Sequence, residues 1–168
     1  MRQLLIEAEE KAKEVSVEIV KRGEILVPVM LVEVPSEKII WSKDKSEKTD
    51  ISTEIVCVHM PNIVKEAFAD AIRQLLRKWN AFGYVFVIEA YITTSKRVVE
   101  ENIPIHNLPA DDRDDIIMIA TVERNGEVKI STAVVIPTKE GRRVEEFKTL
   151  SDMQPGCYAD GRMLVKNW

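Results

Sequence analysis

Residues 116–137 read IIMIATVERNGEVKISTAVVIP, two runs rich in β-branched residues that meet at Asn125-Gly126. Such runs favour strands, and Asn-Gly between them is a strong short-range signal for a two-residue hairpin turn of type I′. This turn needs positive φ at both central residues, which Asn and Gly tolerate. We therefore predict a β-hairpin in which Arg124 and Glu127 pair across the turn.

Apolar spacing along the rest of the chain predicts two helices and several more strands. Helical spacing covers residues 2–22 and 61–80, and the apolar stripe of the first comprises Leu4, Leu5, Ala8, Ala12, Val15 and Ile19. Strands are expected at 25–34, 39–41, 51–60 and 84–92, and in the tail at 142–150 and 162–165. Short links between strands favour antiparallel pairing. The sequence predicts an α+β fold: a mainly antiparallel sheet of about five to seven strands, with two amphipathic helices packed on one face.

The chain has 168 residues, which is the usual length of one domain. We expect a single α+β domain over residues 1–168, with a flexible connector near 43–50, where the sequence reads KDKSEKTD. Residues 93–115 form a long connection with two prolines and no clear periodicity. Loops of this length inside a domain are uncommon and are often functional or disordered.

Composition limits the classes of function and the cellular location. The net charge is −4 and the isoelectric point is near 5.4, which argues against nucleic acid as a partner. Two cysteines are too few for a secreted disulfide framework, and no long apolar run indicates a membrane segment. We expect a cytoplasmic protein. The abundance of Glu and Lys is also typical of thermophiles.

A metal-dependent nuclease motif is suggested by Glu127-Val128-Lys129, because such enzymes pair a Glu-x-Lys with an upstream aspartate. The upstream aspartates here are Asp111, Asp112, Asp114 and Asp115. In the predicted hairpin, Asp115 lies about nine strand positions from Glu127, near 30 Å. One metal ion cannot join residues so far apart, and we interpret the motif as a charged hairpin tip.

Other metal sites have only weak support in the sequence. Asp111 and Asp112 could supply oxygen ligands to a divalent cation, but they lack the spacing of a known calcium loop. A zinc site would have to use every cysteine and histidine of the chain: Cys57, His59, His106 and Cys157. Their separation matches no zinc motif, and a buried, apolar role for Cys57 is the more frequent one.

Glu89 is the only charged residue in the apolar run 84–92. A carboxylate there either faces solvent or is buried with a partner, because an unpaired buried charge costs several kcal/mol. We expect a structural ion pair with Arg113 or Arg97, and the alternatives are an exposed sheet face and a functional acid or base.

Two classes of function follow from these observations. The first is a non-enzymatic interaction module, self-associating or binding a protein partner, because the chain has many short strands with potential free edges and no catalytic signature. The alternative is a small hydrolase or metal-dependent enzyme with its site in the loop 93–115. The candidate residues of that enzyme are Glu89, His106, Asp111, Asp112 and Arg113. No glycine-rich phosphate loop is found among the six glycines, so no cofactor is expected.

Overall fold

The fold is that of a computed structural model, which describes residues 1–36, 52–59, 65–149, 158–159 and 168. The expected connector near 43–50 and the short strands expected at 39–41 and 162–165 lie outside these residues.

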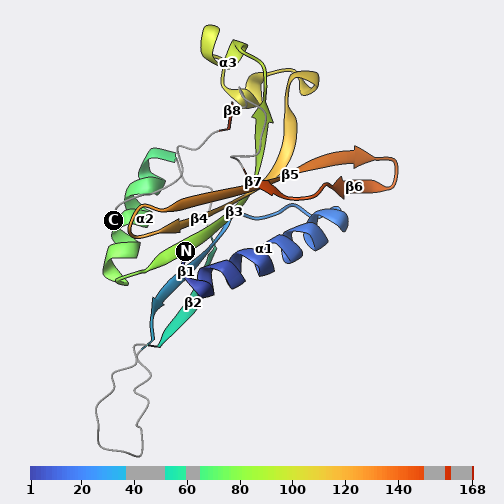
Figure 1. Ribbon diagram of the computed structural model, residues 1–168. Coiled ribbons are helices and arrows are strands. Elements are labelled where there is room, and N and C mark those ends of the chain that lie inside the picture. The colour runs from blue at the N-terminus through green and yellow to red at the C-terminus, as the bar shows by residue number, and fades with distance from the viewer. Residues whose placement is uncertain (37–51, 60–64, 150–157, 160–167) are drawn as a thin grey trace, which may run out of the picture.

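One antiparallel sheet organises the described chain (Figure 1). Its strands follow the order β2-β1-β3-β4-β5-β6, and two short strands pair at the side, β7 with β5 and β8 with β3. The strands are β1 (Val29–Pro35), β2 (Thr53–His59), β3 (Gly83–Thr93), β4 (Asp114–Glu123), β5 (Val128–Thr138), β6 (Gly141–Val144), β7 (Lys148–Thr149) and β8 (Tyr158–Ala159). The expected α+β class with a mainly antiparallel sheet is confirmed.

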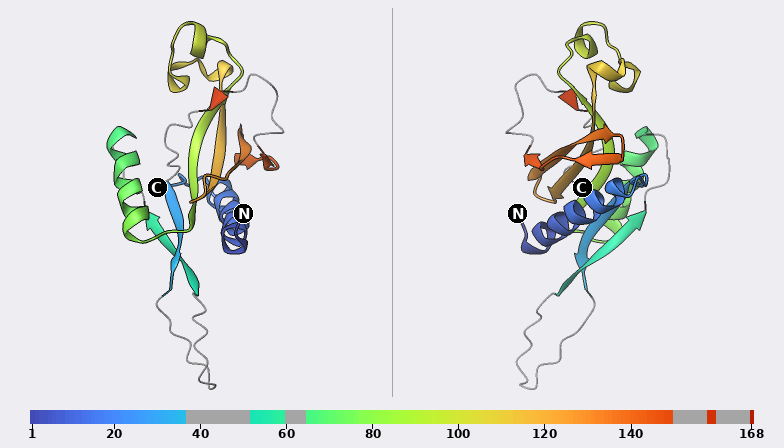
Figure 2. Two further views of the ribbon diagram at one scale, coloured as in Figure 1. Left: turned by 60° about the vertical axis from the view of Figure 1, so that its left-hand side comes forward. Right: turned by 90° about the vertical axis from the view of Figure 1, so that its right-hand side faces the viewer.

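The two main helices, α1 (Gln3–Lys21) and α2 (Lys65–Lys78), lie on opposite faces of the sheet (Figure 2). Val85 and Val87 of β3 pack in the cluster that includes α1, whereas Tyr84 and Phe86 pack in the cluster that includes α2. Successive strand residues point to opposite faces, so odd-numbered residues of β3 face α1 and even-numbered residues face α2. The sequence pattern predicts both helices on one face, and this part of the prediction is wrong. The continuous apolar run of β3 needs cover on both faces, and this places one helix on each.

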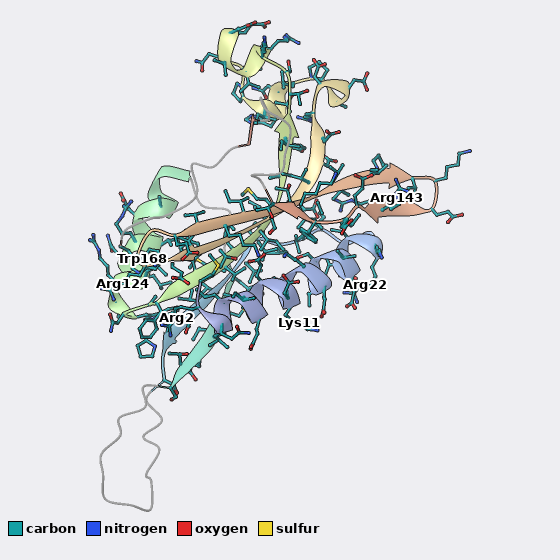
Figure 3. All side chains as sticks on the ribbon, viewed as in Figure 1. Arg2, Lys11, Arg22, Arg124, Arg143 and Trp168 are labelled. Atoms are coloured by element: carbon teal, nitrogen blue, oxygen red, sulfur yellow. The ribbon has the colours of Figure 1, made fainter. Side chains whose placement is uncertain are left out.

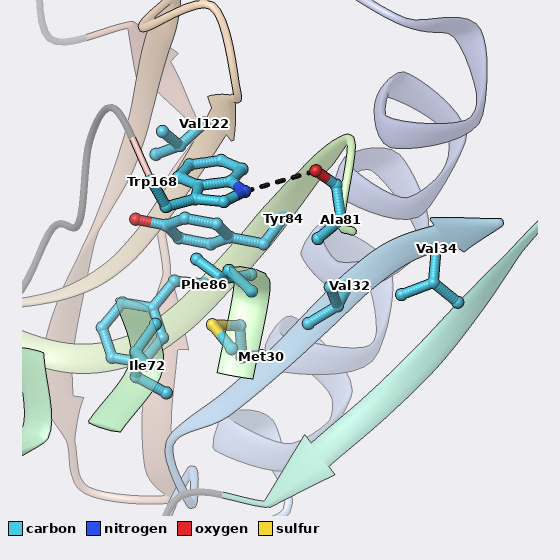
Figure 4. Close-up of a cluster of buried hydrophobic side chains, with 10 residues drawn as sticks. Met30, Val32, Val34, Ile72, Ala81, Tyr84, Phe86, Val122 and Trp168 are labelled. Carbon is cyan, nitrogen blue, oxygen red and sulfur yellow. Dashed lines mark hydrogen bonds between the residues drawn. The ribbon is translucent and has the colours of Figure 1, made fainter. Parts of the chain in front are cut away.

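The aromatic side chain of Trp168 packs in the hydrophobic core beneath α2 (Figure 4). Its indole nitrogen donates to the carbonyl oxygen of Ala81 at 3.2 Å, and its ring lies 5.5 Å from that of Tyr84. Ile72 and Leu76 contribute the buried residues of α2 to the same cluster. Trp168 thus joins the far end of the described chain to β3.

The buried stripe of α1 differs from the expected one. Its buried residues are Leu5, Ala8, Glu9, Ala12, Ser16 and Val20. Val15 was expected on this stripe, but its side chain is 41% exposed. The stripe is rotated because Glu9 and Ser16, both polar, face the sheet.

The turn at Asn125-Gly126 is a three-residue turn, so the expected type I′ geometry is wrong. The amide of Gly126 donates to the carbonyl of Glu123 at 2.9 Å, and the amide of Glu123 donates to the carbonyl of Glu127 at 2.9 Å. Gly126 has a φ of 91°, whereas Asn125 is not among the residues with positive φ. These features define a type I turn followed by a glycine bulge, another common hairpin connection.

The hairpin register is consequently shifted by one residue from the expected register. Val122 lies opposite Val128, where the two-residue turn would have placed Lys129. Arg124 was expected to pair with Glu127, but its guanidinium donates to the side chain of Asn80 at 2.5 Å. The existence of the hairpin was predicted correctly, and its turn type and exact pairing were not.

The long connection between β3 and β4 contains three short helical segments, α3 (Arg97–Glu100), η1 (Ile105–Asn107) and η2 (Ala110–Asp112). It projects beyond the end of the sheet (Figure 1). In the part of the chain that the structure describes, no helix is long and apolar enough to cross a membrane.

Gly83 of β3 lies directly against Leu5 of α1, and its replacement tests this packing. A Cβ atom at this position would collide with the side chain of Leu5 and lie 2.8 Å from the carbonyl oxygen of Val122. We expect Gly83→Ala to lower the free energy of unfolding by about 1–3 kcal/mol, as overpacking does. Urea denaturation measures the change, and Gln74→Ala on the exposed surface of α2 is the control. An unchanged stability would contradict this packing.

Candidate functional site

The carboxylate of Glu9 is buried between α1 and the sheet, with 1% of the residue exposed. It accepts hydrogen bonds from the hydroxyls of Thr121 at 2.9 Å and Ser131 at 3.0 Å. The ammonium groups of Lys13 and Lys129 lie at 2.8 and 2.9 Å. This Glu9 network therefore joins α1 to β4 and β5.

The environment of Glu9 favours its ionised form. Burial disfavours the charge, but the hydrogen bonds from Lys13, Lys129 and Thr121 outweigh this effect and lower the pKa of the carboxyl below its ordinary value. With four partners around it, the carboxylate has little capacity left to bind a ligand or accept a substrate proton. We interpret the Glu9 network as a structural anchor.

A second anchor lies at the start of α1, where Arg2 reaches Glu33 of β1. The Arg2 guanidinium donates to both carboxylate oxygens of Glu33 at 2.7–2.9 Å and stacks 4.2 Å from the ring centre of Phe82. Arg2 is labelled in Figure 3, at the end of the sheet where α1 begins. Glu33 is 1% exposed, so this ion pair also satisfies a buried charge.

Glu89 is paired, as expected, but with Arg142 of β6. The guanidinium of Arg142 approaches the carboxylate at 2.6 Å, and the backbone amide of Leu26 donates to it at 2.9 Å. The predicted partners have other contacts: Arg113 stacks 4.2 Å from the ring centre of Tyr91, and Arg97 forms ion pairs within the projecting loop. Glu89 faces the side of the sheet that α1 covers, and this direction brings it to β6.

The loop residues of the enzymatic hypothesis are mostly exposed. His106, Asp111 and Asp112 lie on the short helical segments and are exposed. Arg113 donates to the backbone carbonyl of His106, and Arg97 lies 3.5 Å from Asp112. The structure thus joins His106 to Arg113 through the backbone, whereas Glu89 is engaged with β6. Among the described residues, no group of three or more His, Cys, Asp or Glu could hold a metal ion.

The residues of the nuclease-like motif are well separated. Asp115 lies opposite Val135 of β5. Val135 is eight residues from Glu127, so Asp115 and Glu127 are about 27 Å apart along the strand. Lys129 is engaged with Glu9. The register differs by one residue from the expected register, and the conclusion that one metal ion cannot join the motif still holds.

Cys57 and His59 lie on β2, two residues apart and so on the same face. Cys57 was expected to be buried, but it is a free, exposed cysteine. The remaining members of the hypothetical zinc set are His106, on the projecting loop, and Cys157, which lies outside the described residues.

The outer edge of β2 is the surface that stands out as a candidate functional site. The amide of Ser36 donates to the carbonyl of Ser52 at 2.7 Å, so the backbone groups of Ser52 point toward β1. Backbone direction alternates along a strand in an antiparallel ladder. The backbone N–H and C=O groups of four residues therefore point away from the sheet: Thr53, Ile55, Cys57 and His59. Among the described residues, no strand pairs with this side of β2.

The two edges of the sheet differ in how well they resist pairing with another chain. Proteins protect edges with short strands, prolines, lysines or bulges. The edge opposite β2 is formed by β6, which has four residues including Arg142 and Arg143, and by β7, which has two; Arg143 is labelled in Figure 3. The β2 edge has seven residues that pair with β1 without interruption, and these residues include neither proline nor lysine. Within the described part of the chain, the β2 edge is therefore open to strand addition.

Comparisons with protein-family models, with curated proteins and with solved structures found no match. The function proposed below therefore rests on the structure. Two features of the structure were not predicted from the sequence: the Glu9 network, and which of the expected strand edges has no partner strand among the described residues. Glu9 had no local signal because Glu7 and Glu10 surround it in the same helix. The uninterrupted run of Thr53–His59 was a signal for β2, but strand order was needed to place it at an edge.

The pH dependence of stability tests the Glu9 network. A carboxyl with a lowered pKa in the folded state stabilises the fold above its unfolded pKa of about 4.3, and this contribution is lost as the pH falls toward the folded pKa. We expect Glu9→Gln to be less stable than the wild type by about 1–3 kcal/mol at pH 7, and the gap to narrow at about pH 3.5.

Urea denaturation at both pH values measures this gap. Glu14→Gln is the matched control, because Glu14 lies on the same helix, its side chain is 66% exposed, and it pairs with Lys11 instead of a member of the Glu9 network. A gap between wild type and Glu9→Gln that stays constant with pH would contradict the proposed ionisation of Glu9.

A double-mutant cycle tests the ion pair between Glu89 and Arg142. Both side chains are about one-quarter exposed, at 27% and 25%, so solvent screens the pair only in part. We expect a coupling energy of about 1 kcal/mol between Glu89→Gln and Arg142→Gln in urea denaturation. Arg143→Gln should give no coupling with Glu89→Gln, and equal coupling for the two arginines would contradict the assignment.

Proposed function

We propose that this protein is a non-enzymatic interaction module that associates with a second copy of itself through the outer edge of β2. The observation that carries the proposal is the row of outward backbone groups at Thr53, Ile55, Cys57 and His59. Each of these residues offers one donor and one acceptor. A strand of this kind is complementary to an antiparallel copy of itself, because every donor can meet an acceptor.

The side chains of β2 also suit a strand partner. Ile55, Val56 and Val58 are only partly buried, so a neighbouring strand could remove more of their apolar surface from water. The one carboxylate, Glu54, lies near the end of the strand, and the central positions carry no charge. Strand addition therefore places no charged side chain at the centre of the interface.

The alternative, a small hydrolase or metal-dependent enzyme in the loop 93–115, gains no specific support from the described residues. Glu89 is already paired with Arg142, and His106, Asp111 and Asp112 are exposed on a projecting segment. We therefore place the interaction module first.

Replacing Cys57 with proline tests the interface without removing a hydrogen bond of the fold. The amide of Cys57 points outward, and proline is tolerated in edge strands when its missing N–H faces solvent. We expect the wild type to form a dimer as its concentration rises from micromolar to submillimolar in sedimentation velocity under reducing conditions. Cys57→Pro should remain monomeric over the same range.

Cys57→Ser is the matched control, because it removes the thiol and keeps the amide; it should associate like the wild type. Circular dichroism checks that both variants remain folded. A wild type that is monomeric at every concentration, or a folded Cys57→Pro that dimerises equally well, would refute the proposal.

A further inference from the structure

We infer that β2 pairs antiparallel with β2 of the second copy about a two-fold axis that passes beside Val56. This inference rests on the proposed function and specifies its geometry. Antiparallel strands join through pairs of directly opposite residues that exchange two hydrogen bonds. Only residues with outward backbone groups can form such pairs across the new interface, so Thr53, Ile55, Cys57 and His59 must oppose one another.

The register centred on Val56 uses all four of these residues. Thr53 then lies opposite His59 of the second copy, and Ile55 lies opposite Cys57 of the second copy. Together with their symmetry mates these are four pairs, and hence eight hydrogen bonds within Thr53–His59. A shift of two residues in either direction leaves three pairs, and a shift of one residue would oppose outward groups with groups already bonded to β1. Maximum pairing therefore selects the central register.

The side chains are compatible with this register. Val56 lies beside its own copy at the axis, and Glu54 lies opposite Val58, so no like charges are directly opposed. Opposite residues of an antiparallel pair lie on the same face of a sheet. Cys57 and Ile55 thus meet on the face that carries α1, and both copies of α1 lie on the same side of one continuous sheet.

The contact is isologous, so it closes as a dimer. In the joined sheet, β2 becomes central, and the outer edge of each copy is formed beside β5 by β6 and the two-residue β7. Both strands are short, and β6 carries Arg142 and Arg143. These edges resist further strand addition. The geometry therefore accounts for a finite assembly, whereas two open edges would permit a fibre.

Distances between spin labels at the two ends of β2 test this register. Labels are attached to Thr53→Cys in one sample and to His59→Cys in another, each with Cys57→Ser and Cys157→Ser to remove the native thiols. In the central register, each labelled position is six residues along the strand from its symmetry mate, so both Cα separations are about 20 Å. Pulsed electron paramagnetic resonance should give the same distance in both samples.

A register shifted by two residues would make the two distances unequal, about 14 Å at one end and about 27 Å at the other. Unequal distances, or distances well beyond this range, in samples that sediment as dimers would overturn the central register and leave self-association standing. Samples of the folded variants that sediment as monomers at every concentration would overturn the pairing together with the proposed function. Circular dichroism of each labelled variant verifies that it is folded.

Discussion

The buried carboxylate of Glu9 is the interaction that holds α1 across the sheet. Taking a carboxylate out of water is costly, and the cost is offset only when hydrogen bonds and opposite charges surround it. Its partners come from three elements, with Lys13 on α1 itself, Thr121 on β4 and Ser131 and Lys129 on β5. These contacts tie the rotation of α1 to the register of the hairpin, together with the apolar side chains that pack between α1 and the sheet.

The partial exposure of β2 follows from the positions of the two helices on the sheet. Helix α1 covers the face to which the odd-numbered residues of β3 point, and α2 covers the opposite face. The central strand β3 is therefore buried on both sides over Gly83–Val87. The helices cover β2 less completely, and Ile55, Val56 and Val58 keep part of their apolar surface exposed. Among the residues that the structure describes, partly exposed apolar side chains and backbone groups without a partner strand therefore occur together on β2. A second copy of β2 would cover this apolar surface and pair these backbone groups, so we propose the interaction at this edge.

Local patterns in the sequence predicted the five longer strands β1 to β5, both main helices and the class of fold, because periodicity and turn residues are local properties. The pattern of α1 did not reveal that Glu9 faces the sheet, since its neighbours Glu7 and Glu10 are chemically identical. Asn125-Gly126 is compatible with both a two-residue turn and a three-residue turn with a bulge, and the sequence could not separate them. Glu89 was correctly expected to be paired, but its partner depended on the position of β6, which is set by tertiary structure.

Amide hydrogen exchange along β2, measured by nuclear magnetic resonance as a function of protein concentration, tests the central claim most directly. The amides of Val56 and Val58 point toward β1, so they should be protected at every concentration and serve as the internal standard. We predict that the amides of Ile55 and Cys57, which point outward, exchange freely in dilute solution and become protected as the concentration rises. If these two amides remain unprotected while the protein associates, the interface lies elsewhere and the account is contradicted.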